Sequence, residues 1–349
     1  MRATACWIAI SCLGLVAPSI QGQGLFEDHA DIGTVLHPGS VSFDQANHSY
    51  SITASGENMW STADAFYFVW KKFSGDVSMT ADIAFPTQTG NPHKKAVLMI
   101  RQSLDADSPY VDEALHVEGL TSLQSRGEKG GATHEVGIAS AAATKLRLEK
   151  RGANFYMYVA RAGEDLHLGG GSMHLELQEP FYIGLGVCAH DKDAMETAVF
   201  SNVSIESPSQ RKPKRYSTLE TISVSSTDRR VVAVFDKRVD APSWTPDGGS
   251  LLFKMGRKIA RIPAAGGSIQ SAGGARSKRN KSREWPSPDG KQVAFLSFDA
   301  DATMLSVRNL SDEKTKVLAK FLARAGTMSD SPWSPDGKRL AFVSYQLVP

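Results

Sequence analysis

Residues able to perform catalysis are scarce in this sequence. His174-Leu175-Glu176 matches half of a zinc-deaminase motif, but the Pro-Cys-x-x-Cys half is missing. The patterns His-Glu-x-x-His and Gly-x-Ser-x-Gly, which mark zinc peptidases and serine hydrolases, are absent as well. A retaining glycosidase needs two carboxyl groups about 5–5.5 Å apart, and no strand-like segment carries a Glu-x-Asp-x-x-Glu arrangement. The sequence therefore predicts no catalytic residues, no metal and no cofactor, and it leans away from an enzyme.

One constellation has the chemistry of a binding site. Indole, carboxylate, amide and guanidinium groups occur near the ends of expected strands, where an indole can stack on a sugar ring and the polar groups can bond its hydroxyls. The candidate ligand-binding residues are Trp60, Asp64, Arg101, Gln124 and Arg126. The alternative is structural: Trp60 and Phe66 in the core, Asp64 capping a turn, and Arg101 solvated on an outer face.

Cys188 is the third cysteine of the chain, after Cys6 and Cys12. It ends the strand-like run that begins at Phe181, where a lone cysteine is usually a small buried hydrophobe. A nucleophilic cysteine would need a partner base, and only the nearby His190 is available for that role. We expect burial, not catalysis.

The N-terminus has the pattern of a secretory signal peptide. Arg2 supplies the positive start, an apolar run follows over residues 6–18, and small residues lead to Gly22. The run is too short for a bilayer span, and no other segment is long enough, so no transmembrane segment is expected. Removal of residues 1–22 would place the mature protein in the periplasm or outside the cell.

Charge gives no reason to expect nucleic acid as a partner. The chain carries 39 basic and 37 acidic residues, which leaves a formal net charge of +2. The segment 208–216 is basic and contains prolines, and it reads as a linker between two domains. Residues 276–283 are basic as well, and we expect them to be solvated charges and not a nucleic-acid site.

The segments between residues 25 and 207 alternate apolar and polar residues with period two, as half-buried strands do. Val77, Met79, Ala81 and Ile83 are one example. Such strands favour two antiparallel sheets packed face to face. The sequence therefore predicts an all-β chain whose first domain, over residues 25–207, is a jelly-roll β-sandwich.

The second half of the chain contains a repeat. Pro246-Asp247-Gly248, Pro288-Asp289-Gly290 and Pro335-Asp336-Gly337 each stand between two strand-like runs, with the aspartates 42 and 47 residues apart. A repeat near this period indicates four-stranded propeller blades, in which proline, aspartate and glycine form the turn between the first two strands. The sequence predicts about three blades over residues 217–349. We also expect residues 221–225 and 230–235 to complete the last blade beside residues 340–345.

The first domain resembles the concanavalin A-like jelly rolls of exported bacterial proteins. The residues that carry this resemblance are Asp31-Ile32-Gly33, Asn58-Met59-Trp60, Asp64-Ala65-Phe66, Gly75-Asp76-Val77, Met99-Ile100-Arg101, Leu146-Arg147-Leu148 and Arg151-Gly152. The resemblance implies a carbohydrate-binding or interaction module, and some relatives of this fold are glycanases.

The second domain resembles the TolB-type, WD40-like propeller of exported bacterial proteins. Besides the three Pro-Asp-Gly repeats, the matching residues are Leu219-Glu220-Thr221-Ile222, Arg229-Arg230-Val231-Val232 and Ala264-Ala265-Gly266-Gly267. Full-size relatives carry about six blades, so this propeller is expected to be incomplete. Three blades leave sheet faces and edges exposed, and these are sites for partners or for self-association.

Three functions follow from these patterns and stay open. The first is a non-catalytic exported binding protein, whose jelly roll takes a glycan or a protein while the propeller serves as scaffold. The second is a Tol-like component of the cell envelope that binds a lipoprotein partner, and it rests on resemblance alone. The third is a glycan hydrolase, which the missing carboxylate pair argues against.

Overall fold

The computed structural model describes residues 24–138, 143–210, 212–272, 284–298, 302–322, 326–328 and 332–348. These residues form strands, turns and loops without a helix, so the all-β prediction is confirmed. Accordingly, no helix in the described ranges could span a bilayer. The predicted signal peptide, residues 1–22, lies outside them.

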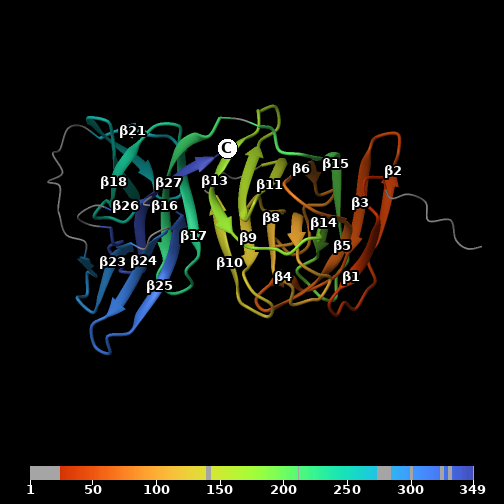
Figure 1. The fold of residues 1–349 in the computed structure, drawn as a ribbon, viewed down its shortest axis with the longest axis horizontal. Coiled ribbons are helices and arrows are strands. Elements are labelled where there is room, and N and C mark those ends of the chain that lie inside the picture. Colours follow the sequence, from red (N-terminus) through yellow and green to blue (C-terminus); the bar gives the residue numbers. More distant parts are fainter. Residues whose placement is uncertain are drawn as a thin grey trace, which may run out of the picture.

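Two sheets packed face to face form the first part of the molecule (Figure 1). The strands of what we call the larger sheet are, in spatial order, β1 (Asp28–Ile32), β5 (Ala63–Phe73), β14 (Phe181–Cys188), β7 (Lys95–Arg101), β8 (Tyr110–His116), β9 (Thr121–Arg126) and β10 (Thr133–Ile138), with β4 (Asn58–Trp60) paired to β5. The strands of the smaller sheet are β13 (His167–His174), β12 (Asn154–Ala160), β11 (Lys145–Arg151), β6 (Val77–Ala84), β15 (Glu196–Glu206), β3 (Ser49–Ala54) and β2 (Ser40–Asp44).

The core lies between these two sheets and follows the period-two pattern of the sequence. Val77, Met79, Ala81 and Ile83 all point into it and are 3% exposed or less, as predicted. A second cluster covers the outer face of the larger sheet and includes Met59 of β4 and Phe66 of β5. The larger sheet is therefore buried on both faces over much of its area.

The second part of the molecule consists of three four-stranded antiparallel units. Unit I contains β26 (Gly326–Thr327), β27 (Arg339–Val348), β16 (Lys214–Ser223) and β17 (Arg229–Phe235). Unit II contains β18 (Val239–Trp244), β19 (Ser250–Met255), β20 (Lys258–Pro263) and β21 (Gln270–Ser271). Unit III contains β22 (Glu284–Pro286), β23 (Gln292–Phe298), β24 (Ala302–Asn309) and β25 (Thr315–Leu322). One apolar cluster joins units I and II, and another joins units I and III.

The Pro-Asp-Gly turns have the geometry that the sequence predicts. The glycines Gly248, Gly290 and Gly337 have φ of 68°, 67° and 70°, the left-handed region that glycine adopts without strain. Each aspartate accepts hydrogen bonds from a hydroxyl two residues before it and from the backbone two residues after it. These bonds lower the pKa of all three carboxyl groups, beginning with the bond from the hydroxyl. The aspartates therefore shape turns.

The two ends of the second part meet in unit I. β16 pairs with β27 along ten residue pairs, from Lys214 with Val348 to Ser223 with Arg339. The expectation that these ends share a sheet is confirmed, but one detail of it is wrong. Residues 230–235 pair with β16 and not with residues 340–345, because β16 lies between them.

A parallel strand pair joins the two parts of the molecule. Val136 of β10 pairs with Arg229 of β17, so the larger sheet and unit I form one 12-stranded sheet. β16 begins at Lys214, within the segment expected to be a linker. Gly170 of β13 makes the close approach possible, because a Cβ atom there would lie 2.6 Å from the Val234 side chain. The domain boundaries at residues 207 and 217 stay predictions.

Candidate functional site

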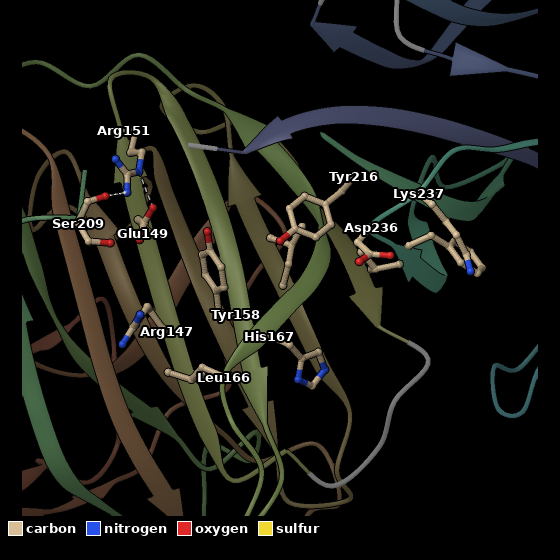
Figure 2. A pocket seen from close by; sticks show the side chains of 13 residues that line it. Arg147, Glu149, Arg151, Tyr158, Leu166, His167, Ser209, Tyr216, Asp236 and Lys237 are labelled. Atoms are coloured by element: carbon tan, nitrogen blue, oxygen red, sulfur yellow. Dashed lines mark hydrogen bonds and ion pairs between the residues drawn. The ribbon is translucent and has the colours of Figure 1, made fainter. Parts of the chain in front are cut away.

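A groove of about 630 Å³ lies where the smaller sheet meets unit I (Figure 2). One wall comes from β11, β12 and the start of β13, and the other comes from β16, the end of β17 and the residues after it. The lining residues are Arg147, Glu149, Arg151, Tyr158, Leu166, His167, Leu168, Ser209, Tyr216, Val234, Phe235, Asp236 and Lys237. The outer face of the smaller sheet supplies most of the polar groups.

The period of two along β11 explains one wall. Leu146 and Leu148 point into the core, so Arg147, Glu149 and Arg151 point outward into the groove. Arg151 Nε lies 2.5 Å from Glu149 Oε1, and Arg151 Nη2 donates to the carbonyl of Ser209 at 2.8 Å. This ion pair is only slightly exposed, with 12% and 6% of the two side chains accessible. The ion pair fixes the end of the wall, and the hydrogen bond from Arg151 to Ser209 holds the segment that leads into unit I.

Two tyrosines face the groove from opposite walls. Tyr158 lies on β12 and Tyr216 on β16, and both are half-buried. They pack with Leu168, Tyr156 and other residues in a small apolar cluster between the sheets. Burial raises the pKa of Tyr156, so its hydroxyl stays protonated. Figure 2 shows both rings among the side chains that line the groove, Tyr158 from β12 and Tyr216 from β16.

Charged groups line the open side of the groove. Lys214 Nζ lies 3.5 Å from Asp236 Oδ2 and 5.3 Å from the centre of the Tyr216 ring. His167 and Lys237 are exposed at the rim. Arg147 donates through Nε to Thr80 Oγ1 at 2.9 Å, which holds its guanidinium over the sheet. The groove therefore combines two aromatic rings with donors and acceptors of both signs, and it can hold a polar ligand with apolar faces.

The five residues predicted from the sequence lie together, but not in this groove. They form a network on the outer face of the larger sheet, beneath β4. Arg126 Nη2 lies 2.7 Å from Asp64 Oδ1, and Arg101 Nη2 lies 3.4 Å from Asp64 Oδ2. Arg126 also donates to the carbonyl of Trp60 at 3.2 Å, and Gln124 accepts from Lys95 at 2.9 Å.

The exposed fractions of these side chains show which of the sequence-based interpretations are correct. Asp64 is 3% exposed and Arg101 is fully buried, so the interpretation of Arg101 as a solvated side chain is wrong. Phe66 is core, as the structural alternative expected, whereas Trp60 is half-buried with Lys95 Nζ 5.8 Å from its ring centre. Burial raises the pKa of Asp64 against the opposing effect of Arg126 and Arg101. The ligand-binding role of the five residues stays a prediction.

Two members of the network were missed by the sequence reasoning. Lys95 is buried and donates to the carbonyl of Met59 at 2.8 Å. Asp112 is also buried, and neither carboxylate oxygen has a hydrogen-bond partner among the described residues. Burial raises its pKa to about 8, although Lys95 acts in the opposite direction. Lys95 stands at the start of the apolar run of β7 and Asp112 is followed by Glu113, so in the sequence both look like solvated charges and nothing marks them as buried.

The candidates for catalysis do not assemble into a site. Cys188 is fully buried, and burial raises the pKa of its thiol, which agrees with the expected apolar role. His174 and Glu176 are exposed, 3.6 Å apart. Within the described ranges, no three His, Cys, Asp or Glu side chains are placed to hold a metal ion.

Comparison with known proteins gives distant likenesses. No family model matches the chain. An uncharacterized protein, Atu1656 of Agrobacterium fabrum, is 29% identical over 123 residues, which cover 31% of this chain and 40% of that protein. The chain thus matches well under two thirds of that relative's length, and no family assignment follows.

Three solved structures illustrate the structural neighbours. The carbohydrate-binding module CBM66 from Bacillus subtilis is 19% identical and covers 52% of this chain and 98% of its own, with a TM-score of 0.36. A family 7 alginate lyase, A1-II', is 8% identical over 48% of this chain and 82% of its own, with a TM-score of 0.34. A putative TolB from Agrobacterium tumefaciens is 17% identical over 79% and 100%, with a TM-score of 0.18. These scores are too low to carry a functional argument.

Proposed function

We propose that the chain is a non-catalytic, exported binding protein that takes a glycan in the groove between the smaller sheet and unit I. The three units act as a scaffold that supplies the second wall. The observation that supports this most directly is the pair Tyr158 and Tyr216, which line the same 630 Å³ cavity from β12 and β16 together with charged hydrogen-bonding groups. Pyranose rings present apolar faces and hydroxyl edges, and this combination of side chains complements both.

The polar groups of the groove include both donors and acceptors for sugar hydroxyls. Arg147 and Lys237 donate, Asp236 accepts, and His167 can do either. The groove is open to solvent, because His167, Ser209, Asp236 and Lys237 are all exposed. No rearrangement is needed for a ligand to enter it, in contrast to the buried network around Asp64.

A glycan array probed with the full mature chain tests the proposal. Glycans that bind are then titrated against the parent, Tyr216→Ala and Tyr182→Ala. Tyr182 is the matched control, a half-buried tyrosine on the outer face of the larger sheet whose ring packs edge-on against Trp70. We expect Tyr216→Ala to weaken binding about fivefold while Tyr182→Ala leaves it unchanged, since one stacked ring contributes about 1 kcal/mol.

Two results would oppose the proposal. If no glycan binds but an envelope protein does, the partner is a protein and the groove is not a sugar site. If Tyr216→Ala and Tyr182→Ala weaken binding equally, the glycan does not occupy the groove. Thermal melts of both variants show whether either result comes from loss of the fold.

A further inference from the structure

The near-neutral net charge conceals a strong separation of charge along the chain. Residues 25–207 contain 13 Lys or Arg and 24 Asp or Glu, a net charge of −11. Residues 208–349 contain 25 Lys or Arg and 13 Asp or Glu, a net charge of +12. The part of the molecule that includes one wall of the groove is thus strongly basic, and such a field attracts polyanions.

Within the described residues, positive charge gathers on the hairpin β19–β20 of unit II. Lys254, Arg257 and Lys258 occupy the end of this hairpin and are all exposed. The sequence from Asp247 to Glu284 contains no acidic residue between these two. Asp240 pairs with Lys254 across the strands but is held by Arg238 at 2.9 Å. The hairpin end therefore keeps an excess of positive charge.

Strand register places this hairpin end beside the rim of the groove. Lys237 lines the groove and lies two residues before Val239, the first residue of β18. Val239 is the cross-strand partner of Met255, and Met255 is the partner of Lys258. Neighbouring strands lie about 5 Å apart and each residue of chain spans about 3.5 Å, so Lys258 and Lys237 are less than about 20 Å apart.

The charged side chains inside the groove also favour an anionic ligand. Glu149 is paired with Arg151, and Asp236 with Lys214. Arg147 and Lys237 are the remaining charged side chains of the lining, and both are basic. A neutral sugar would leave these two cations uncompensated, whereas a carboxylate sugar would pair with them.

We propose that the ligand is an acidic polysaccharide, whose chain runs from the groove over Lys237 onto the basic hairpin end at Lys254, Arg257 and Lys258. This inference rests on the proposed glycan-binding function and adds the ligand's charge and its path. Nucleic acid fits less well, because the hairpin end carries no aromatic side chain on which bases could stack. An anionic bilayer fits less well too, because none of the exposed large apolar side chains in the described part of the chain lies at the hairpin end.

The test uses polygalacturonate and the same polymer after complete methyl esterification, which removes its charge but keeps its backbone. The full mature chain is compared with Lys254→Glu/Lys258→Glu and with Lys129→Glu/Lys192→Glu. The second pair is the control, because Lys129 and Lys192 are equally exposed, at 60% and 61%, on the acidic part of the molecule.

We expect the parent to bind polygalacturonate at least tenfold more tightly than the esterified polymer, and binding to weaken as salt rises from 50 to 300 mM. The hairpin variant should lose about tenfold in affinity, and the control should lose little. Equal binding of both polymers, or equal losses in both variants, would overturn the inference while leaving glycan binding intact. Absence of binding to either polymer would count against the proposed function as well, and tighter binding of a DNA duplex of equal charge would overturn the choice of polysaccharide.

Discussion

Asp112 shows how burial changes the chemistry of a single residue in this molecule. Its carboxyl group is fully buried on β8, and burial raises its pKa to about 8 from a usual value near 4. The folded state therefore holds a proton that the unfolded state releases between pH 4 and pH 8. Over this range the unfolded state binds fewer protons, so the contribution of Asp112 to stability falls as pH rises.

Replacing Asp112 by asparagine removes this titration while keeping the shape of the side chain. We expect Asp112→Asn to be more stable than the parent at pH 8 by roughly 5 kcal/mol, the free energy of a four-unit pKa shift, and the difference to disappear near pH 4. Urea unfolding at pH 4.5 and pH 8 measures it. A difference that is the same at both values would show that Asp112 is not protonated in the folded protein at pH 4.5.

Trp60 belongs to the constellation that the sequence predicts. Its ring is half-buried above Lys95, and the contact that Arg126 makes with this residue uses the backbone carbonyl. We therefore expect Trp60→Ala to fold and to lose about 1 kcal/mol, the size of an exposed cation–π contact. Weaker glycan binding in the folded variant would support the sequence-based site. A variant without a cooperative melt would show that Trp60 is core, where the loss is about 3–5 kcal/mol.

At the scale of the elements, local sequence patterns predicted individual strands and turns, but they did not predict which distant strands pair. Alternation along β6 and the Pro-Asp-Gly turns predicted strands and turns that the structure contains. The parallel pair of β10 and β17 joins residues more than 90 positions apart, and no local pattern encodes it. The groove was missed for the same reason, because its walls are outward-facing residues that read as solvated faces until β17 is placed beside β13.

Gly170 is the position at which this junction can be tested. It has φ of 84°, and an added Cβ would meet Val234 Cγ2 at 2.6 Å and Val231 Cγ1 at 2.8 Å. Gly163 has φ of 80° and no atom within 4 Å of an added Cβ, so it is a control for backbone strain alone. We expect Gly170→Ala to lower stability by about 1–3 kcal/mol more than Gly163→Ala, because overpacking adds to the strain. Equal melting temperatures for the two variants would contradict close packing at the junction.

β16 holds the two ends of the second part together, because it pairs with β17 on one side and with β27 on the other. Deleting residues 217–236 removes β17 and most of β16, which leaves β27 without its ten-residue partner. An unpaired strand edge with buried apolar side chains promotes association, so we expect aggregation on size-exclusion chromatography. A variant that stays monomeric and melts like the parent would contradict this role of the pairing.

For the whole molecule, the sequence predicted two kinds of β architecture in the right order but treated them as independent. The junction makes the second part a wall of the candidate site, because Tyr216 and residues 234–237 come from unit I and from the segment that follows it. Total charge was also misleading at this scale, since −11 and +12 nearly cancel along the chain. The junction and the charge separation both depend on which segments of the chain fold together. The overall composition does not contain that information.

Hydrogen–deuterium exchange of the full mature chain, with and without a bound glycan from the array, tests the central claim most directly. If the glycan lies in the groove, residues 147–151, 158–167 and 234–237 become protected, and exchange over residues 95–126 does not change. Protection confined to residues 58–64 and 95–126 would contradict it, because the ligand would then occupy the network around Asp64 and Arg126 beneath β4.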